Sequence, residues 1–433
     1  MKDPQIAELI RFVREHSPFY RELYAGLADD TAELTALPLI PMRDYWAAHG
    51  LRDSRVMTGP HTDGVVFNTG GTTSAPRISV YTWDEWRSAG RLFGEALVAA
   101  GLREGDRVAN LFYAGRLYPS FVFLYDCVQD LPVRTVQLPI SGNAPLDFTV
   151  GVMRDFAATV VAAPPTSLCR LATEVVGSVG SLPDVRLVLF GGEAFYDDQL
   201  ALIARAFPAA EVRSGGYGSV DAGGLGGPVP DEPDTRVHET FPDKVLELLD
   251  PDTGEVVEEP GRPGRVVVTD LTRRLMPLLR YPVGDLAEWV DFPRRRFRLL
   301  GRSGEEAKVG TVNVDLEGLH RLVAGADEAG RAVGMQAVVR HREGLDELVL
   351  RLAGASGSGV DGADGAEGAD GADAAGRADL ERALTARVHV EDFAETLELG
   401  LIHPLAIEWV APDGLASNPR TGKRLRLIDE RVG

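Results

Sequence analysis

Residues 84–113 read DEWRSAGRLFGEALVAAGLREGDRVANLFY and join a helical pattern to a short apolar run. Outward from this stretch, between Gly64 and about Val290, similar apolar runs recur and alternate with further helical stretches: TVVAAP at 159–164, VRLVLFGG at 185–192 and RVVVTDL at 265–271. Alternation of this kind is typical of parallel strands joined by crossover helices. The sequence therefore predicts an α/β fold.

A second pattern begins after a basic, glycine-punctuated stretch at 292–304, FPRRRFRLLGRSG. It comprises three short strands and one helix, at 335–341, 347–353, 405–410 and 380–389. A chain of 433 residues is also too long for one typical core. We predict a large N-terminal domain over 1–302, with parallel or mixed sheets and flanking helices, and a small, mobile α+β C-terminal domain over 303–433.

One segment of the small domain has an unusual composition. Residues 353–378 read AGASGSGVDGADGAEGADGADAAGRA and contain almost no large apolar side chains. Such a tract has little to offset the entropy of ordering. We predict a disordered surface loop, which serves as a solvated spacer unless a specific function is found for it.

Composition excludes several classes of function. The formal charge of -20 opposes a nucleic-acid partner, because a phosphate backbone is repelled at long range. Cys127 and Cys169 are too few for a disulfide framework or a multi-cysteine zinc site, and the start of the chain lacks an apolar signal core. No apolar run approaches the roughly 20 residues that a membrane span needs. These features predict a cytoplasmic protein without a membrane partner.

The glycine- and threonine-rich stretch FNTGGTTSAPR, at 67–77, follows the apolar run GVVF. Its backbone N–H groups and hydroxyls can surround phosphate oxygens, and Arg77 adds a permanent positive charge. The spacing of a Walker loop is absent from the sequence. Taken alone, the stretch also fits an ordinary turn.

Two further motifs suit other parts of a nucleotide. In SGGYGSVD, at 214–221, glycines flank Tyr217, so a planar base can approach the ring closely, and Asp221 can ligate Mg²⁺. In RYPVGD, at 280–285, Asp285 can accept hydrogen bonds from ribose hydroxyls. Each motif alone also fits a solvated surface turn.

The last two motifs are GRSGEEAK, at 301–308, and NPRTGKR, at 418–424. Gly304 has the backbone freedom that an interdomain hinge uses, and Lys423 lies on a glycine-marked turn near the C-terminus. Alone, these are an interdomain linker and a solvated basic tail.

The order, spacing and residue types of the five motifs resemble one superfamily, the adenylate-forming acyl-CoA synthetases and peptide-synthetase adenylation domains. Over nearly its whole length the chain is similar to the phenylacetate-coenzyme A ligase branch, through the stretches at 16–24, 138–168, 190–195, 266–285 and 418–431. A weaker similarity, through GGTTSAPR at 70–77 and YGSVDAG at 217–223, links it to adenylating proteins of phenazine-type aromatic acid pathways.

The resemblance implies a role for each motif. The phosphate-binding residues would be Thr69, Gly70, Gly71, Thr72, Thr73 and Arg77. The adenine side would comprise Gly191, Gly192, Glu193, Tyr217, Gly218 and Ser219. Asp221 would bind the metal, Asp285 and Arg302 the ribose side at the domain junction, and Gly304 would be the hinge. Lys423 would bridge the carboxylate and the α-phosphate, with Arg302 as its catalytic companion. The acyl pocket would be lined by Phe112, Tyr113, Ile140, Ser141 and Phe190.

Several positions depart from the family pattern. Arg77 replaces a lysine and Asp221 a glutamate, which keeps the charge in both cases. Val220 stands where a threonine contacts the α-phosphate, and Ser74 replaces a glycine of the phosphate loop. Finally, 282–283 reads Pro-Val instead of Arg-Thr.

The expected function is ATP- and Mg²⁺-dependent activation of a small, aromatic carboxylic acid as its acyl-AMP, followed by transfer to coenzyme A. Three alternatives stay open: a short aliphatic acid as the substrate; a carrier protein, an amine or a reductase as the acceptor, in secondary metabolism; and a degenerate module that binds a nucleotide without turnover. The family also suggests a homodimer.

Overall fold

The computed structural model describes residues 4–50, 52–68, 77–193, 195, 197–230, 232–302, 306–327, 330–354, 369–388, 391–411, 414–416 and 425–431. These residues form two compact units, one that ends at Leu300 and one that begins at Gly301. The strand that links the units, β15 (Arg296–Arg302), runs through this division. The expected domain boundary at residues 302 and 303 is close to it.

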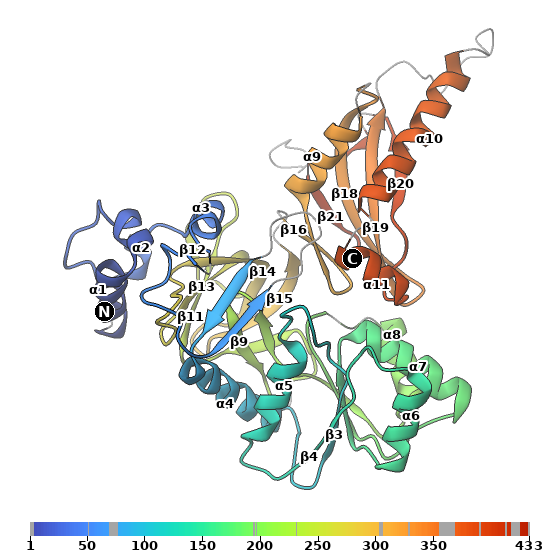
Figure 1. Cartoon of the computed structure of the whole chain (residues 1–433), viewed down its shortest axis with the longest axis horizontal. Helices are drawn as coiled ribbons and strands as arrows, with labels where there is room; N and C mark the ends of the chain where they lie inside the picture. The colour runs from blue at the N-terminus through green and yellow to red at the C-terminus, as the bar shows by residue number, and fades with distance from the viewer. Residues whose placement is uncertain are drawn as a thin grey trace. The chain divides into compact units, whose positions relative to one another are not determined.

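The first unit opens with short helices (Figure 1). Helix α2 begins after Ser17, whose side chain accepts a hydrogen bond from the backbone N–H of Tyr20. Leu9, Tyr20 and Tyr45 are fully buried and pack in one core with Tyr281. The elements are α1 (Pro4–His16), α2 (Pro18–Leu23), η1 (Leu34–Ala36) and α3 (Met42–Ala47).

The centre of the first unit is a parallel sheet of five strands in the order β4-β3-β5-β6-β7. Crossover helices connect the strands, which confirms the α/β prediction for this part of the chain (Figure 1). Helix α4 starts with a capping box between Thr82 and Glu85. The strands are β3 (Arg107–Asn110), β4 (Val136–Pro139), β5 (Val160–Ala163), β6 (Leu187–Phe190) and β7 (Glu211–Ser214); the helices are α4 (Trp83–Ala99), α5 (Ser120–Gln129), α6 (Leu146–Asp155), α7 (Pro165–Ser178) and α8 (Asp197–Ala206).

The rest of the first unit departs from the predicted pattern. An eight-stranded sheet in the order β12-β11-β13-β14-β15-β10-β9-β8 follows the parallel sheet. The run at 265–271 was expected to be a parallel strand, but β13 pairs antiparallel with both β11 and β14, so this expectation is wrong. The physical reason is the connections: the described residues from 215 to 302 contain no helix that could carry a parallel crossover. The strands are β8 (Tyr217–Ser219), β9 (Gly223–Pro228), β10 (Val237–Thr240), β11 (Lys244–Leu249), β12 (Val256–Val257), β13 (Pro263–Asp270) and β14 (Tyr281–Asp291), with β15.

A short hairpin frames the glycine- and threonine-rich stretch. Strand β1 (Val65–Asn68) pairs antiparallel with β2 (Ile78–Tyr81), with Asn68 opposite Ile78. The residues between them, 69–76, lie outside the described part of the chain. The hairpin nevertheless fixes where this stretch leaves and re-enters the unit.

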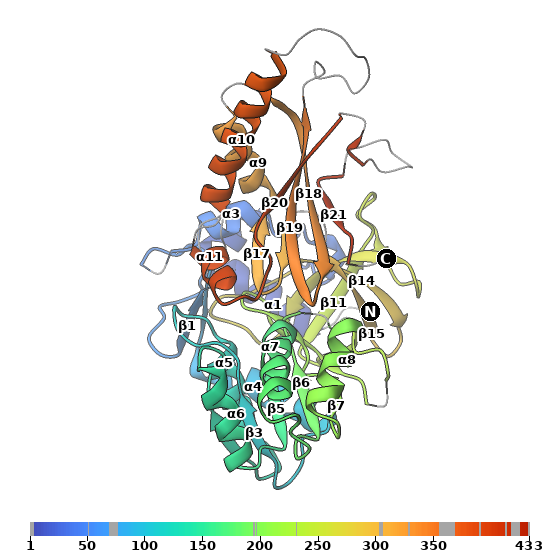
Figure 2. The same ribbon diagram turned by 90° about the vertical axis from the view of Figure 1, so that its right-hand side faces the viewer.

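The second unit is α+β, as predicted (Figure 2). Its main sheet has the order β20-β19-β18-β21, and Leu348, Leu350, Leu384 and Phe393 form part of its buried core. The strands are β16 (Glu306–Val309), β17 (Val312–Asp315), β18 (Ala332–Arg342), β19 (Leu345–Gly354), β20 (Ala406–Val410) and β21 (Leu427–Asp429); the helices are α9 (Leu316–Ala326), α10 (Ala369–Val388) and α11 (Glu391–Glu398).

The expectation of a disordered loop over the whole of 353–378 is wrong at both ends. Strand β19 continues to Gly354, and helix α10 already begins at Ala369. Alanine is the strongest helix former, and the C-terminal part of the tract, ADGADAAGRA, is rich in it. Residues 355–368 lie outside the described part of the chain.

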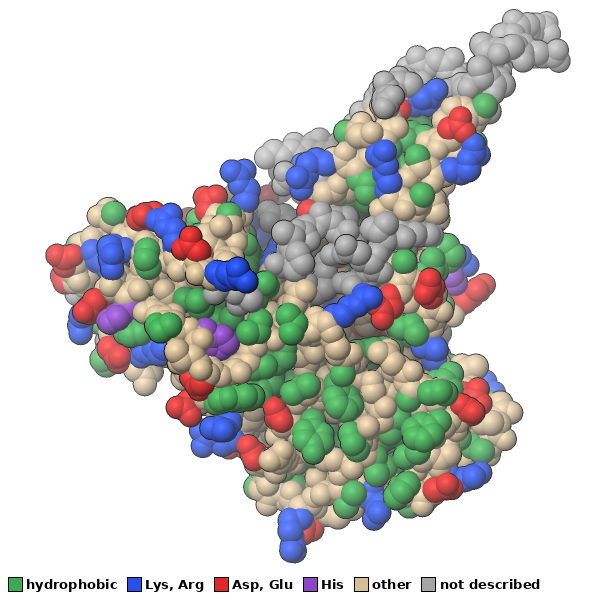
Figure 3. Space-filling model, in the orientation of Figure 1, with side chains coloured by type: hydrophobic (Ala, Val, Ile, Leu, Met, Phe, Trp, Pro, Cys, Tyr) green, Lys and Arg blue, Asp and Glu red, His purple; other side chains and the backbone are tan. Residues whose placement is uncertain are grey.

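Apolar side chains gather on one face of the first unit, over the region of α5, α6 and β3 (Figure 3). The exposed large apolar residues of this region are Val122, Tyr125, Val136, Phe148 and Phe156. Within the part of the chain that the structure describes, no helix has both the length and the apolar character to cross a lipid bilayer.

Candidate active site

Several of the predicted site residues lie at one edge of the parallel sheet. Its strands end at Pro139, Asn110, Ala163, Phe190 and Ser214. In open parallel sheets, ligands bind outside the carboxyl ends of the strands. The predicted residues that follow these ends directly are Phe112 and Tyr113 after β3, Ile140 and Ser141 after β4, Phe190, Gly191, Gly192 and Glu193 at the end of β6, and Tyr217 after β7.

The predicted acyl-pocket residues are tied together at the ends of β3 and β4. The Asn110 carbonyl accepts a hydrogen bond from the backbone N–H of Ser141, at 2.9 Å. The Asn110 side-chain oxygen accepts one from the N–H of Phe112, at 3.1 Å. The Tyr113 hydroxyl lies 2.8 Å from Ser167 Oγ, at the start of α7, and burial raises the pKa of Tyr113. These bonds hold Phe112 and Tyr113 at the carboxyl edge of the sheet.

Glu193 links the end of β6 to the start of α7. Its Oε2 atom accepts hydrogen bonds from the backbone N–H of Thr166, at 3.2 Å, and from the Thr166 hydroxyl. A side chain on Gly191 would reach the ring of Phe112, since its Cβ would lie 3.8 Å from that ring. Gly192 has a φ of 85°, which favours glycine. At the end of β6, the backbone of Gly191, which has no side chain, therefore lies next to the ring of Phe112.

A buried network supports the turn that leads to Tyr217. Ser214 Oγ lies 3.0 Å from His238 Nε2, and His238 Nδ1 lies 2.9 Å from the Arg236 carbonyl. A carbonyl only accepts, so Nδ1 carries the proton and Nε2 accepts from the Ser214 hydroxyl. Ser214 Oγ in turn accepts from the N–H of Gly216, at 3.1 Å. Gly216 has a φ of 136° and a Cβ there would lie 2.7 Å from the Phe93 ring, so only glycine fits.

The structure brings the predicted adenine and ribose residues into direct contact. The Tyr217 hydroxyl donates to Asp285 Oδ2 at 2.7 Å, although the two residues lie on different strands, β8 and β14. The Tyr217 ring packs edge-on against Phe297, with the ring centres 5.7 Å apart. Gly284, with a φ of 91°, turns the chain just before Asp285. Both ends of this pair are therefore fixed by the fold.

Asp221, the predicted metal ligand, is only 6% exposed and accepts hydrogen bonds on both carboxylate oxygens. Oδ1 accepts from the Ser219 hydroxyl at 2.6 Å and from the backbone N–H of Ala222 at 3.1 Å. Oδ2 accepts from the hydroxyl of Tyr281, which is fully buried. Arg77 Nη1 lies 3.6 Å from the same oxygen. Two predicted residues, Arg77 and Asp221, are thus brought together.

Asp221 supplies one carboxylate that could hold a Mg²⁺ ion. Among the described residues, no group of three or more histidine, cysteine, aspartate or glutamate side chains is placed to hold a metal ion. One carboxylate, at Asp221, is what Mg²⁺ uses when substrate phosphates supply its other ligands. The donor set fits a Mg²⁺ ion whose other ligands come from phosphates.

Arg273 and Tyr281 were missed by the sequence reasoning. Arg273 is 2% exposed and donates to the Asp221 carbonyl at 2.6 Å and to the Val80 carbonyl at 3.2 Å. Its guanidinium also lies 4.1 Å from the centre of the Tyr81 ring. Arg273 therefore fixes the Asp221 turn against β2, the strand that follows the phosphate-loop stretch. The run TDLTRRLMP contains it, but nothing in the spacing distinguishes the buried Arg273 from Arg274.

Two departures from the family pattern have structural explanations. Val220 packs against the cluster of Phe67, Tyr81 and Trp86, and Val283 is buried in the main core of the first unit. The hydroxyl of Ser219 is donated to Asp221, so in this structure it does not replace the threonine hydroxyl expected at position 220. Apolar packing therefore explains why valine is present at positions 220 and 283.

Several predicted residues lie outside the described part of the chain. These are Thr69, Gly70, Gly71, Thr72, Thr73, Gly304 and Lys423, and for Arg302 only the backbone, at the end of β15, is described. Their roles stay predictions.

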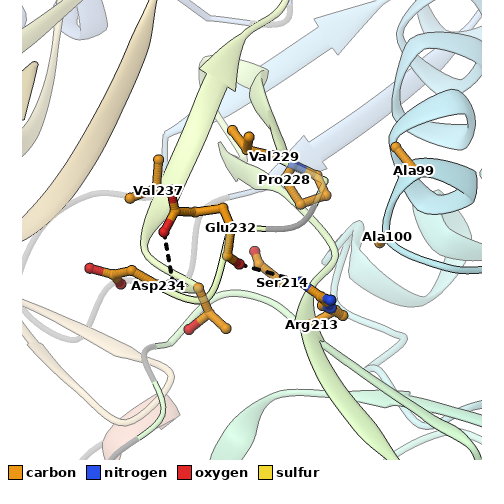
Figure 4. Close-up of a pocket in the computed structure, with 10 residues that line it drawn as sticks. Ala99, Ala100, Arg213, Ser214, Pro228, Val229, Glu232, Asp234 and Val237 are labelled. Atoms are coloured by element: carbon orange, nitrogen blue, oxygen red, sulfur yellow. Dashed lines mark hydrogen bonds between the residues drawn. The ribbon is translucent and has the colours of Figure 1, made fainter. Parts of the chain in front are cut away.

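A small pocket lies on the side of Ser214 that faces β9 and β10 (Figure 4). Its volume is about 10 Å³, and Arg213, Glu232 and Asp234 contribute to its lining. Such a volume holds at most one water molecule. It is not a candidate for the nucleotide or the acid.

The chain is similar in sequence and in fold to known coenzyme A ligases. No protein-family model matches the chain. It is 26% identical over 366 residues to a phenylacetate-coenzyme A ligase from Thermus thermophilus, covering 81% of this chain and 80% of the relative. It is also 26% identical over 332 residues to the enzyme of that name from Pseudomonas putida, covering 71% of this chain and 72% of the relative.

The fold is similar to that of a solved 2-hydroxyisobutyryl-CoA ligase, in complex with 2-HIB-AMP and CoA in the thioesterification state. The TM-score is 0.69 at 20% identity, over 99% of this chain and 88% of the other. The chain is similar in sequence to phenylacetate-coenzyme A ligases and similar in fold to a 2-hydroxyisobutyryl-CoA ligase.

Proposed function

We propose that this protein uses ATP and Mg²⁺ to activate a small aromatic carboxylic acid as its acyl-adenylate, and then transfers the acyl group to coenzyme A. The observation that carries the proposal is that predicted site residues from distant segments meet in two pairs. Tyr217 contacts Asp285, and Arg77 contacts Asp221. Chance placement of unrelated turns does not account for two such contacts between distant segments.

Each pair suits one part of ATP. The ring of Tyr217 offers a face for adenine, and the Asp285 carboxylate, fixed beside it, suits the ribose hydroxyls. Arg77 supplies a guanidinium for the phosphate oxygens that the stretch 69–76 would surround. Mg²⁺, when bound at Asp221, would neutralise charge on those oxygens.

The reaction joins two anions, so positioning and charge neutralisation are the main catalytic tasks. A carboxylate oxygen forms a bond to the α-phosphorus, the bond from that phosphorus to the bridging oxygen breaks, and pyrophosphate leaves. We assign Lys423 to the negative charge shared by the carboxylate and the α-phosphate. In the second step a thiolate attacks the acyl carbonyl and AMP leaves.

An aromatic acid suits the aromatic residues at the sheet edge. Phe190 is almost fully buried, and its ring packs edge-on against Phe195 with the centres 4.9 Å apart. Phe112 packs, partly buried, over the neighbouring strands. Apolar aromatic walls favour a flat acid with one anionic end.

Coenzyme A is the proposed acceptor because the relatives in sequence are named as coenzyme A ligases. A carrier protein, an amine or a reductase would need the same adenylate, so the first half-reaction does not discriminate between acceptors. Formation of a thioester from coenzyme A and the acid, without any protein partner, does.

A second candidate is a module that binds nucleotide without turnover. The observation that favours it is Val220, whose side chain packs into an apolar cluster where a hydroxyl was expected. The presence of Lys423 in the sequence favours catalysis, since a module freed from turnover has no need for that lysine.

The test is carboxylate-dependent exchange of labelled pyrophosphate into ATP across a panel of aryl and short aliphatic acids, with and without Mg²⁺. We expect Mg²⁺-dependent exchange with at least one aryl acid, and thioester when coenzyme A is added. Exchange only with aliphatic acids would contradict the aromatic assignment. Measurable ATP binding without exchange for any acid would favour the non-catalytic module.

A further inference from the structure

Groups of the chain occupy most of the hydrogen-bonding positions of the Asp221 carboxylate. An ionised carboxylate offers about four lone-pair sites. Among the described residues, three hydrogen bonds reach them, from the Ser219 hydroxyl and the Ala222 N–H at Oδ1 and from the Tyr281 hydroxyl at Oδ2, and the Arg77 guanidinium lies 3.6 Å from Oδ2 as an ion-pair partner. A metal ion at Oδ2 would therefore meet the positive charge of Arg77.

These four groups are not equally replaceable. Ser219 and Ala222 are neighbours of Asp221 in the chain, and the Tyr281 side chain is fully buried in the main core. The Arg77 contact is the longest of those measured, at 3.6 Å, and the Arg77 side chain is 26% exposed. Arg77 is the group that can move without unpacking the core.

Arg77 and Mg²⁺ compete for the same oxygen. Magnesium binds carboxylate oxygens at about 2.0–2.1 Å and keeps a rigid octahedral shell, so a guanidinium cannot stay against Oδ2. The two cations also repel each other at that distance. Phosphate oxygens are strong partners for a displaced guanidinium, which binds them through a planar fork.

We propose that the ion pair between Arg77 and Asp221 keeps metal ions from Asp221, and that binding of ATP together with Mg²⁺ breaks this ion pair. In the nucleotide-free protein, Arg77 and Asp221 neutralise each other. When both ligands bind, the phosphates take Arg77 and the metal takes Asp221. This inference rests on the proposed function, because it assumes that ATP binds at the sheet edge. Neither the metal alone nor ATP alone obtains its full set of partners, so their binding is coupled through this pair.

A double-mutant cycle on ATP binding in the presence of a metal chelator tests the exchange. Asp221→Asn releases Arg77 and also removes a negative charge, whereas the same change in an Arg77→Gln background removes only the charge. We expect Asp221→Asn to tighten metal-free ATP binding by at least about tenfold more in the Arg77 protein than in the Arg77→Gln protein, an effect within the usual range for contacting pairs. The exposed pair Arg87–Asp84, at 3.8 Å, provides a matched control cycle in which no such difference is expected.

If Asp221 acted only through its charge, Asp221→Asn would increase metal-free ATP affinity by the same factor in the Arg77 and Arg77→Gln proteins. Equal increases in affinity overturn the proposal. Failure of the chain to bind ATP in any variant overturns the proposed function as well. Binding with equal gains leaves the proposed function standing and rejects only the exchange. The two failures are therefore distinguishable, and no acid is needed for the measurement.

A second measurement does not depend on the folding of Asp221→Asn. Mn²⁺ binding without nucleotide is followed by electron paramagnetic resonance in the parent protein and in Arg77→Gln. We expect Arg77→Gln to bind Mn²⁺ at least about tenfold more tightly than the parent, because the guanidinium no longer competes with the metal for Asp221. Equal Mn²⁺ affinities, or no binding by either protein, contradict the proposal.

Discussion

At the residue scale, the hydroxyl of Tyr217 holds Asp285, and we predict that the ring of Tyr217 stacks on adenine. Two substitutions separate these roles. Tyr217→Ala removes the ring, and stacking on a base is worth roughly 1–3 kcal/mol, so we expect ATP affinity to fall by about 5- to 150-fold. Tyr217→Phe keeps the ring and should cost much less. Calorimetric titration with ATP measures both, and equal losses in the two variants would refute the stacking role.

A substitution at Val220 is expected to increase the rate of pyrophosphate exchange. Its side chain packs against Phe67, Tyr81 and Trp86 where the family resemblance expects a hydroxyl for the α-phosphate. Val220→Thr has nearly the same volume and restores a donor, so we expect faster acid-dependent pyrophosphate exchange, by up to about 10²-fold. Val220→Ala, which adds no hydroxyl, is the control. A threonine variant no faster than the alanine variant would show that position 220 makes no phosphate contact.

A substitution at Lys423 tests its proposed role in adenylate formation. A preorganised donor aimed at developing charge commonly contributes about 10²- to 10³-fold in rate. We therefore expect Lys423→Ala to lose nearly all acid-dependent exchange while it keeps its affinity for ATP, with Arg426→Ala as a charge-matched control. An alanine variant with more than half the parental exchange rate would remove Lys423 from the mechanism.

The sequence allowed part of the site to be predicted. The Gly-Tyr-Gly pattern and the Gly-Asp turn indicated Tyr217 and Asp285, because glycines mark places where a ligand approaches the backbone. The contacts of Arg273 and Tyr281 with Asp221 were not predictable, since they join segments that lie 52 and 60 residues apart in the chain. A buried arginine in a run of two arginines carries no local signal.

At the scale of elements, the connections decided what could be predicted. Runs such as 159–164 and 185–192 are followed by amphipathic helices, and they form parallel strands as expected. The run at 265–271 has the same apolar character but belongs to an antiparallel sheet. Composition alone does not report strand direction. In the tract 353–378, composition predicted disorder, but the alanine-rich end has enough helix propensity to form the start of α10.

The side-chain hydrogen bond between Ser214, at the end of β7, and His238, on β10, predicts a pH dependence of stability. Burial lowers the pKa of His238 from its ordinary 6.5 to about 4. Between these values the unfolded chain binds a proton that the folded chain does not, so the free energy of unfolding decreases as the pH falls. The full loss from pH 6.5 to pH 4 is about 3 kcal/mol, at 1.36 kcal/mol per pH unit.

Denaturant unfolding of the parent and of His238→Asn, which does not titrate, measures this contribution. We expect a shallower decline of stability below pH 6.5 in His238→Asn than in the parent. His16→Gln, at an exposed histidine, is the control and should keep the parental pH profile. Parallel profiles for the parent and His238→Asn would mean that His238 does not titrate differently in the two states.

At the scale of the whole molecule, the two units are joined through β15 and the residues after it. We predict that Gly304 acts as a hinge between the half-reactions. Proline at this position fixes φ and removes an N–H group, so Gly304→Pro should slow thioester formation while it spares pyrophosphate exchange. Gly304→Ala is the milder control. Thioester formation by Gly304→Pro at the parental rate would exclude the hinge.

The central claim is that the acid becomes attached to AMP. The most direct test uses an acid that supports exchange, labelled with heavy oxygen in its carboxylate, and mass analysis of the nucleotide released during thioester formation. Attack by the carboxylate on the α-phosphorus predicts that each AMP carries one heavy oxygen from the acid. Unlabelled AMP, or ADP together with labelled inorganic phosphate, would contradict an acyl-adenylate.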